Sequence, residues 1–240
     1  MTPRQKKLLQ AIIDEFIETA DAVGSINLAN KYKLGVSPAT IRNEMAELVD
    51  QGFLEQPHLS SGRIPTNMGF RFLINELINH LDELEVENSL QIYEDMFQTR
   101  FDNDELIYHA VKTLADLSNN LALVVLGKRV YYSGLSNLII QPEFLERSDL
   151  KKIMMMLENS TELRTLFAKS HSANNIKILV GEDCDLSYMK RAAIIFSEFH
   201  SHGDKIGYLS IVGPNRMNYH EILPVFNFIG KSLNQVISGW

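Results

Sequence analysis

The sequence lacks several features that would place it in other classes of protein. It has one cysteine, Cys184, in 240 residues, so an internal disulfide is impossible and a reducing compartment is expected. No apolar run approaches the length that crosses a bilayer, and the N-terminus lacks the apolar stretch of a signal peptide. We therefore expect a cytoplasmic protein with no membrane contact.

Positive charge is also scarce. The formal net charge is −7, which on its own disfavours a polyanionic partner. Residues 1–80 hold eight Lys and Arg against nine Asp and Glu, so most of the acidic excess lies further along the chain. With 45% hydrophobic and 22% charged residues the composition is that of a globular protein. Any surface for a nucleic acid must be local.

Recognisable motifs for catalysis or cofactor binding are absent. There is no phosphate loop, catalytic triad or zinc-ligand spacing, so neither an enzyme nor a cofactor is expected. Glu198, His200 and His202 alternate as metal ligands on a strand could, but this alternation is more typical of a solvent-facing strand, and we predict no metal. Acidic neighbours should raise the pKa of Cys184, which disfavours a nucleophile.

The first fifty residues have the pattern of three helices. Thr2, Pro3 and Gln5 form a capping-box signature ahead of a helical apolar stripe. Ser25 is expected to cap a short second helix. Ser37, followed by Pro38, is expected to cap a third helix that ends before Gly52.

The third helix is expected to have two different faces. At 100° per residue, Ile41, Met45 and Leu48 face the core. The opposite face is small, polar and basic, and consists of Ala39, Thr40, Arg42, Asn43 and Ala46. Small residues permit close approach to the major groove, and Arg and Asn can read base edges. The alternative for such a helix is a solvated amphipathic surface.

A hairpin pattern follows this helix. Phe53 to Gln56 reads as a strand, Ser60 to Arg63 as a tight turn with an exposed guanidinium, and Ile64-Pro65 as the return, after which Thr66 can cap another helix. This order predicts a winged helix-turn-helix whose tip arginine lies against the DNA backbone or in the minor groove. The predicted DNA-binding residues are Ser25, Ser37, Ala39, Thr40, Arg42, Asn43, Ser60, Ser61, Gly62, Arg63 and Thr66.

Several runs resemble the HrcA family of heat-inducible transcription repressors. In the first eighty residues they are Val23 to Ser25, Ser37 to Leu48, Gly52 to His58 and Ser60 to Thr66. Further runs are Gly134 to Leu138, Gln141 to Phe144 and Ile211 to Tyr219. The resemblance implies a GAF-like domain, an inverted-repeat operator upstream of chaperonin genes, and a repressor whose active form is sustained by the chaperonin. Family members are longer and carry an inserted dimerising domain, for which this chain has no room.

The expected fold class is α+β, with a winged helix-turn-helix at 1–75, a helical connector at 76–120 and a GAF-like α/β domain at 121–240. In the last domain, 176–180, 193–200 and 206–212 read as strands. A final helix follows Asn218.

An inverted-repeat operator implies a homodimer. Leu73, Leu77, Leu81 and Leu84 recur near the 3.5-residue spacing of a helix-pairing seam and are predicted to lie on one helix after the hairpin. The alternative is that these leucines pack against the chain's own helix at 107–121, with the dimer formed through the GAF-like domains.

The sequence thus favours a sequence-specific repressor of heat-shock chaperone genes that binds double-stranded DNA. The alternative is a metabolite-responsive repressor that uses the GAF-like domain as a small-molecule sensor.

Overall fold

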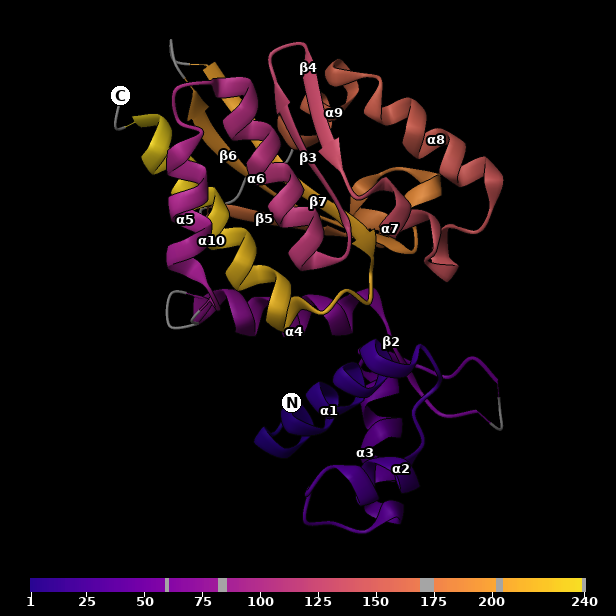
Figure 1. Cartoon of the computed structure of the whole chain (residues 1–240). Coiled ribbons are helices and arrows are strands. Elements are labelled where there is room, and N and C mark those ends of the chain that lie inside the picture. Colours follow the sequence, from indigo (N-terminus) through magenta and orange to yellow (C-terminus); the bar gives the residue numbers. More distant parts are fainter. Residues whose placement is uncertain (59–60, 82–85, 169–174, 202–204, 239–240) are drawn as a thin grey trace. The chain divides into compact units, whose positions relative to one another are not determined.

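The computed structural model describes residues 1–58, 61–81, 86–168, 175–201 and 205–238 (Figure 1). The chain divides into two units. The first comprises Met1–Asn79 with Arg216–Tyr219, and the second comprises His80–Asn215 with His220–Trp240.

The first unit begins with α1 (Pro3–Thr19), which the sequence predicts through its capping box. The Thr2 hydroxyl accepts a hydrogen bond from the Gln5 backbone N–H at 3.2 Å, and the Gln5 side chain accepts one from Thr2 at 2.8 Å. These bonds satisfy backbone donors that a helix start leaves unpaired. The capping-box prediction is confirmed.

The second helix, α2 (Ser25–Lys31), begins differently from the prediction. Its N-cap is Gly24, in extended conformation, and no side chain caps it. Ser25 is the first helical residue and is buried. The expected Ser25 cap is therefore wrong by one position, because the preceding glycine adopts the capping conformation.

The rest of the first unit follows the predicted order. It contains α3 (Pro38–Asp50), β1 (Leu54–Glu55), β2 (Ile64–Pro65) and α4 (Asn67–Asn79). The two short strands pair antiparallel, with Leu54 opposite Pro65. Gly52 has φ +80°, which suits glycine at the helix end. The core of this unit consists of Leu8, Leu9, Ile12, Ile13, Leu28, Ile41, Leu48 and Phe70, all of them at most 1% exposed.

The predicted leucine seam does not form on one helix. Helix α4 ends at Asn79, so Leu81 follows the helix, and Leu84 lies outside the described residues. Leu73 and Leu81 are buried within the single chain and Leu77 is half-buried. Of the two alternatives that the sequence leaves open, a pairing seam or packing within the chain, burial within the chain accounts for Leu73 and Leu81.

Within the described residues, the second unit is built on an antiparallel sheet in the order β4-β3-β7-β6-β5. Its strands are β3 (Leu121–Leu126), β4 (Arg129–Ser133), β5 (Ile176–Val180), β6 (Ala192–Ser201) and β7 (Lys205–Pro214). The strands predicted at 176–180, 193–200 and 206–212 are confirmed. The order places β3 beside β7, with Leu121 opposite Val212.

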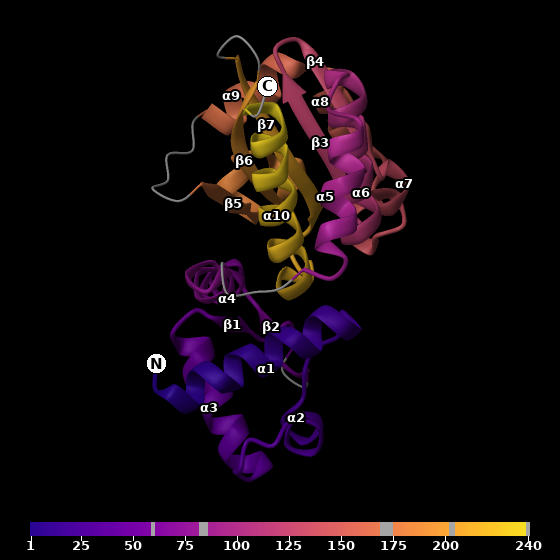
Figure 2. The same cartoon turned by 60° about the vertical axis from the view of Figure 1, so that its left-hand side comes forward.

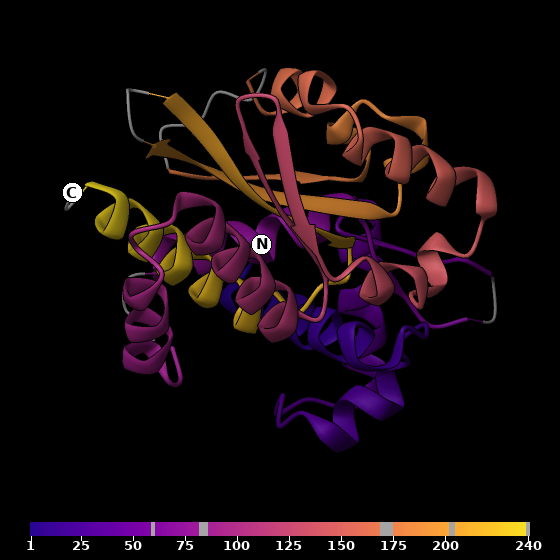
Figure 3. The same cartoon turned by 45° about the horizontal axis from the view of Figure 1, so that its top comes forward.

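Helices cover both faces of this sheet (Figure 3). On one face lie α6 (Asn103–Ser118) and α10 (Tyr219–Ser238), with α5 (Ser89–Gln98) packed on α6 (Figure 2). On the other lie α8 (Arg147–Leu157) and α9 (Ser160–Ala168). Short helices α7 (Leu135–Ile139), η2 (Pro142–Phe144), η3 (Gly181–Cys184) and η4 (Ser187–Met189) complete the unit.

Strand alternation sends side chains to these two layers. Leu121, Leu123 and Val125 of β3 join a buried cluster with Ile153 of α8 and Phe167 of α9. Because successive strand residues point to opposite faces, Ala122 and Val124 face the α6 and α10 side. Residues 76–120 are therefore not a separate connector, since α6 packs directly on β3 and β4.

Candidate nucleic-acid interface

Helix α3 begins with a local network of hydroxyl groups. The Ser37 side chain accepts from the Thr40 backbone N–H at 3.2 Å and lies 3.0 Å from the Thr40 hydroxyl. Pro38 occupies the first turn, where its missing N–H costs nothing. Ser37 and Thr40 therefore fix where the helix starts.

The two faces of α3 are as the sequence predicts. Ile41, Met45 and Leu48 are buried, whereas Ala39, Arg42, Asn43 and Ala46 are exposed and Thr40 is half-buried. In the part of the chain that the structure describes, the side chains of Arg42 and Asn43 have no hydrogen-bond or ion-pair partner. A guanidinium and an amide are thus presented to solvent side by side.

Helix α1 holds α3 from behind. The Arg4 guanidinium forms an ion pair with Glu44, whose side chain is 8% exposed. One turn further along α3, the Gln5 amide donates to the Glu47 carboxylate at 2.7 Å. These contacts leave the solvent face of α3 unobstructed.

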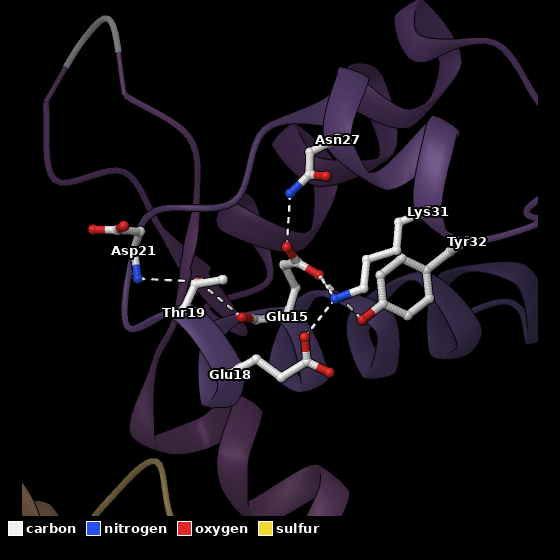
Figure 4. A network of polar contacts seen from close by, with 7 residues as sticks. All are labelled: Glu15, Glu18, Thr19, Asp21, Asn27, Lys31 and Tyr32. Carbon is white, nitrogen blue, oxygen red and sulfur yellow. Dashed lines mark hydrogen bonds and ion pairs between the residues drawn. The ribbon is translucent and has the colours of Figure 1, made fainter.

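A second polar cluster fixes α2 to α1 around Glu15 (Figure 4). The Glu15 carboxylate accepts from Asn27 and Lys31, each at 2.7 Å, and from the Tyr32 hydroxyl at 3.3 Å. Lys31 also contacts Glu18. The Glu15 side chain is only 6% exposed, so this pairing compensates for its burial.

Glu15 is expected to make the first unit acid-sensitive. The hydrogen bond from Lys31 lowers the pKa of Glu15 below its ordinary value of 4.5, against the opposing effect of burial. A carboxyl with a depressed folded-state pKa contributes stability above its unfolded pKa and loses it as pH falls through the folded value. Wild type should therefore lose stability below about pH 4.5.

Glu15→Gln should lower the free energy of unfolding by roughly 1–3 kcal/mol at pH 7. The difference from wild type should shrink below about pH 4.5. Urea unfolding from pH 7 to pH 3 measures both effects. Glu18→Gln is the matched control, because Glu18 is 61% exposed and its ion pair should contribute less than about 1 kcal/mol. A pH-independent deficit for Glu15→Gln would count against the ionised cluster.

The connection between β1 and β2 is closed by Ser61. Its hydroxyl donates to the His58 carbonyl at 2.7 Å and accepts from the His58 N–H at 2.9 Å. The Gln56 amide donates to the Ser61 carbonyl at 3.3 Å. The predicted contact residue Ser60 lies outside the described residues.

Arg63 is not the freely exposed tip that the turn pattern predicted. Its backbone pairs with Val23 through two hydrogen bonds of 2.9 Å, which tie this connection to the segment before α2. The side chain is half-buried, and its guanidinium donates to the Ser61 carbonyl at 3.4 Å. A backbone pairing between residues forty positions apart leaves no signal in the local sequence.

These segments enclose a cavity of about 510 Å³. It is lined by Val23, Gly24, Ser25, Ile26, Arg42, Met45, Gln56, Ser61, Gly62 and Arg63. Arg42 from α3 and Arg63 from the hairpin side therefore contribute to one concave, cationic surface. Among the predicted contact residues, the cavity also includes Ser25, Ser61 and Gly62.

The remaining predicted contact residues that the structure describes lie outside this cavity. Ala39, Thr40 and Asn43 lie on α3 and Ser37 caps it, but none of the four lines the cavity. Thr66 caps α4 as predicted, because its hydroxyl accepts from the Gly69 N–H at 3.2 Å and its carbonyl accepts from the Phe70 N–H at 3.1 Å. The hydroxyl also donates to the Gly52 carbonyl at 2.6 Å, just after α3. The sequence analysis did not predict that Gln56 lines the cavity. Its position as a polar residue directly after β1 could have suggested it.

The candidates for metal binding and nucleophilic chemistry lie in the second unit. Glu198 pairs with Lys177 at 3.1 Å, and the His200 backbone N–H donates to the Asn234 side-chain oxygen at 3.1 Å. His202 is not among the described residues. Burial raises the pKa of Cys184 to about 12, as predicted in direction. In the described ranges, no group of three or more His, Cys, Asp or Glu is placed to hold a metal, and no helix is long and apolar enough to cross a membrane.

Comparison with known proteins defines the class of the chain. A heat-inducible transcription repressor HrcA from Carboxydothermus hydrogenoformans is 26% identical, and the match covers 98% of this chain and 97% of the relative. The protein of that name from Pelotomaculum thermopropionicum is 25% identical, and the match covers 98% of this chain and 96% of that protein. These relatives indicate a heat-inducible transcription repressor, a class whose members are generally not enzymes.

The chain belongs to the HrcA family, because the family model "HrcA protein C terminal domain" matches residues 49–223. The alignment with the first relative extends over 337 positions although this chain has 240 residues, so a sizeable part of that relative has no counterpart here. The crystal structure of a hypothetical protein has the same fold, with a TM-score of 0.82 at 18% identity and coverage of 100% of this chain and 99% of that one.

Proposed function

We propose that the first unit is a winged helix-turn-helix that binds double-stranded DNA, with α3 in the major groove and the β1–β2 connection as the wing. The observation that supports this most is the unpartnered Arg42/Asn43 face of α3, adjoining a cavity that also contains Arg63. Arginine and asparagine form bidentate hydrogen bonds with guanine and adenine edges.

We further propose that the chain represses heat-shock chaperone genes from the cytoplasm. Its operator would be an inverted repeat, and the active repressor would be sustained by the chaperonin. A two-fold operator calls for a homodimer. Because Leu73 and Leu81 are buried within one chain, we assign the pairing to the second unit, proposed to be a GAF-like domain.

A gel-shift assay with the upstream region of the cell's own chaperonin genes tests this function, with sedimentation of the protein–DNA complex to count protomers. Two protomers should bind one operator at nanomolar protein. Affinity should fall reversibly on heating while far-UV circular dichroism stays native, and added chaperonin should restore it. Binding that is lost only with global unfolding, without rescue by chaperonin, would contradict the heat-shock role.

A second candidate is a repressor that responds to a small molecule bound by the second unit. It is favoured by a cavity between α9 and β5. In that case a ligand, rather than chaperonin, would change the operator affinity.

Arg63 is expected to act on the DNA backbone. Arg63→Ala should weaken specific and non-specific binding together, and should make the log–log dependence of affinity on salt shallower by about one unit. Arg63→Lys keeps the charge and should retain the wild-type slope. Lys128→Ala, which removes an exposed cation from the second unit, is the control and should change neither quantity. An altered operator preference with an unchanged slope would mean that Arg63 reads bases.

A further inference from the structure

The second unit contains the cavity that favours the second candidate function, on which this inference rests, and DNA binding does not use it. It has a volume of about 470 Å³ and lies between α8, α9, β5 and η3. This volume falls within the usual range of small-molecule pockets. The cavity lies on the sheet face that α8 and α9 cover.

The interior of this cavity is apolar. Met156 and Cys184, each 1% exposed, lie beside the half-buried Leu166, Leu179 and Leu186. Burial raises the pKa of the Cys184 thiol to about 12, so the sulfur is neutral at physiological pH. These side chains can accept an alkyl or aryl group but offer it little hydrogen bonding.

The polar part of the lining is entirely acidic or neutral. It consists of Glu162, Asp183, Asp185, Asn159, Thr161 and Thr165, with no Lys or Arg among the lining residues that the structure describes. Asn159 accepts a hydrogen bond from the Glu162 N–H at 3.2 Å, and Asp183 accepts one from the Val180 N–H at 3.2 Å. These bonds fix the start of α9 and the turn from β5 into η3.

The ammonium group of Lys152 on α8 has partners of its own. Lys152 lies 3.8 Å from the Asp149 carboxylate and 5.6 Å from the centre of the Tyr188 ring, and it does not line the cavity. Among the lining residues that the structure describes, an anionic ligand would therefore meet carboxylates without a compensating cation. A cationic ligand would find opposite charge at the rim and apolar surface inside.

We propose that this cavity binds a small organic cation, an amine whose ammonium group faces Glu162 and Asp185 and whose apolar body lies on Met156, Leu166 and Leu179. Such binding would give the repressor a response to amines that is separate from the DNA surface. Contact with the apolar side chains supplies affinity, and the carboxylates at the rim select a cationic ligand over a neutral or anionic one.

The test uses the full chain and ligands that share one body. 2-Phenylethylamine, 2-phenylethanol and 3-phenylpropionate differ mainly in the head group, and hexylamine with 1-hexanol repeats the comparison on an alkyl body. Calorimetric titration and thermal melting are measured at low and physiological salt. We expect the amines to bind and raise the melting temperature by mass action, the alcohols to bind at least tenfold more weakly, and the carboxylate not to bind.

Variants separate this site from surface adsorption. Glu162→Gln with Asp185→Asn should weaken amine binding about tenfold and leave the alcohols unchanged. Thr165→Trp, at an exposed position on the rim, should reduce binding of every ligand. Glu158→Gln removes an exposed carboxylate outside the cavity and should have no effect.

Two results would overturn the proposal. One is the absence of binding by both amines at millimolar concentration. The other is amine binding that matches the alcohols or persists unchanged in both cavity variants, provided that their circular dichroism is native. Neither result depends on DNA binding, so failure here leaves the proposed operator function standing, and the reverse also holds.

Discussion

Replacing Arg42 or Asn43 by alanine is expected to weaken specific operator binding by roughly 1–3 kcal/mol for each substitution, the effect of one lost bidentate base contact. Both side chains are exposed on α3 and neither has a partner in the described part of the chain. Folding should therefore be affected by no more than about 0.5 kcal/mol. Gel shifts with operator and with unrelated DNA separate specific from general binding.

The structure identifies a suitable control for this pair. Glu47 accepts a hydrogen bond from Gln5 at 2.7 Å, so Glu47→Ala would also disturb the contact between α1 and α3. Asp50 is exposed at the end of α3 and has no such bond. Asp50→Ala should leave specific binding nearly unchanged. Wild-type operator affinity in folded Arg42→Ala and Asn43→Ala would reject α3 as the recognition helix.

Gly62→Ala is expected to destabilise the first unit strongly. A Cβ atom at Gly62 would lie 2.3 Å from the Val23 carbonyl oxygen and 2.8 Å from the Ala22 carbonyl carbon. Both are backbone atoms and cannot turn aside. The two chain segments would have to separate, and the Val23–Arg63 pairing of two 2.9 Å hydrogen bonds would be lost. We expect a loss of about 2–4 kcal/mol, together with a strong loss of DNA binding.

Urea unfolding and gel shifts measure these two consequences of Gly62→Ala. Gly24→Ser is the matched control on the opposing segment. A Cβ at Gly24 meets nothing within 4 Å, and serine is a favourable N-cap for α2. Gly24→Ser should be as stable as wild type or slightly more so. Wild-type stability and DNA binding in Gly62→Ala would show that the close approach to Val23 is not required.

The sequence by itself determined the features that depend on neighbouring residues. The capping box of Thr2 and Gln5, the start of α3 at Pro38 and its end before Gly52 follow from local hydrogen bonding and backbone preference. Helical periodicity then fixes which face of α3 is buried, so the exposure of Arg42 and Asn43 was predictable.

The tertiary structure decided what depends on distant segments. Pairing of Arg63 with Val23 half-buries a side chain that the turn pattern alone presents as exposed. The end of α4 at Asn79 places Leu81 outside the helix that its leucine spacing suggested. The sheet order places β3 between β4 and β7, and α6 packs against these three strands. These features arise because long-range strand pairing and side-chain packing outweigh local propensity, and no window of neighbouring residues encodes them.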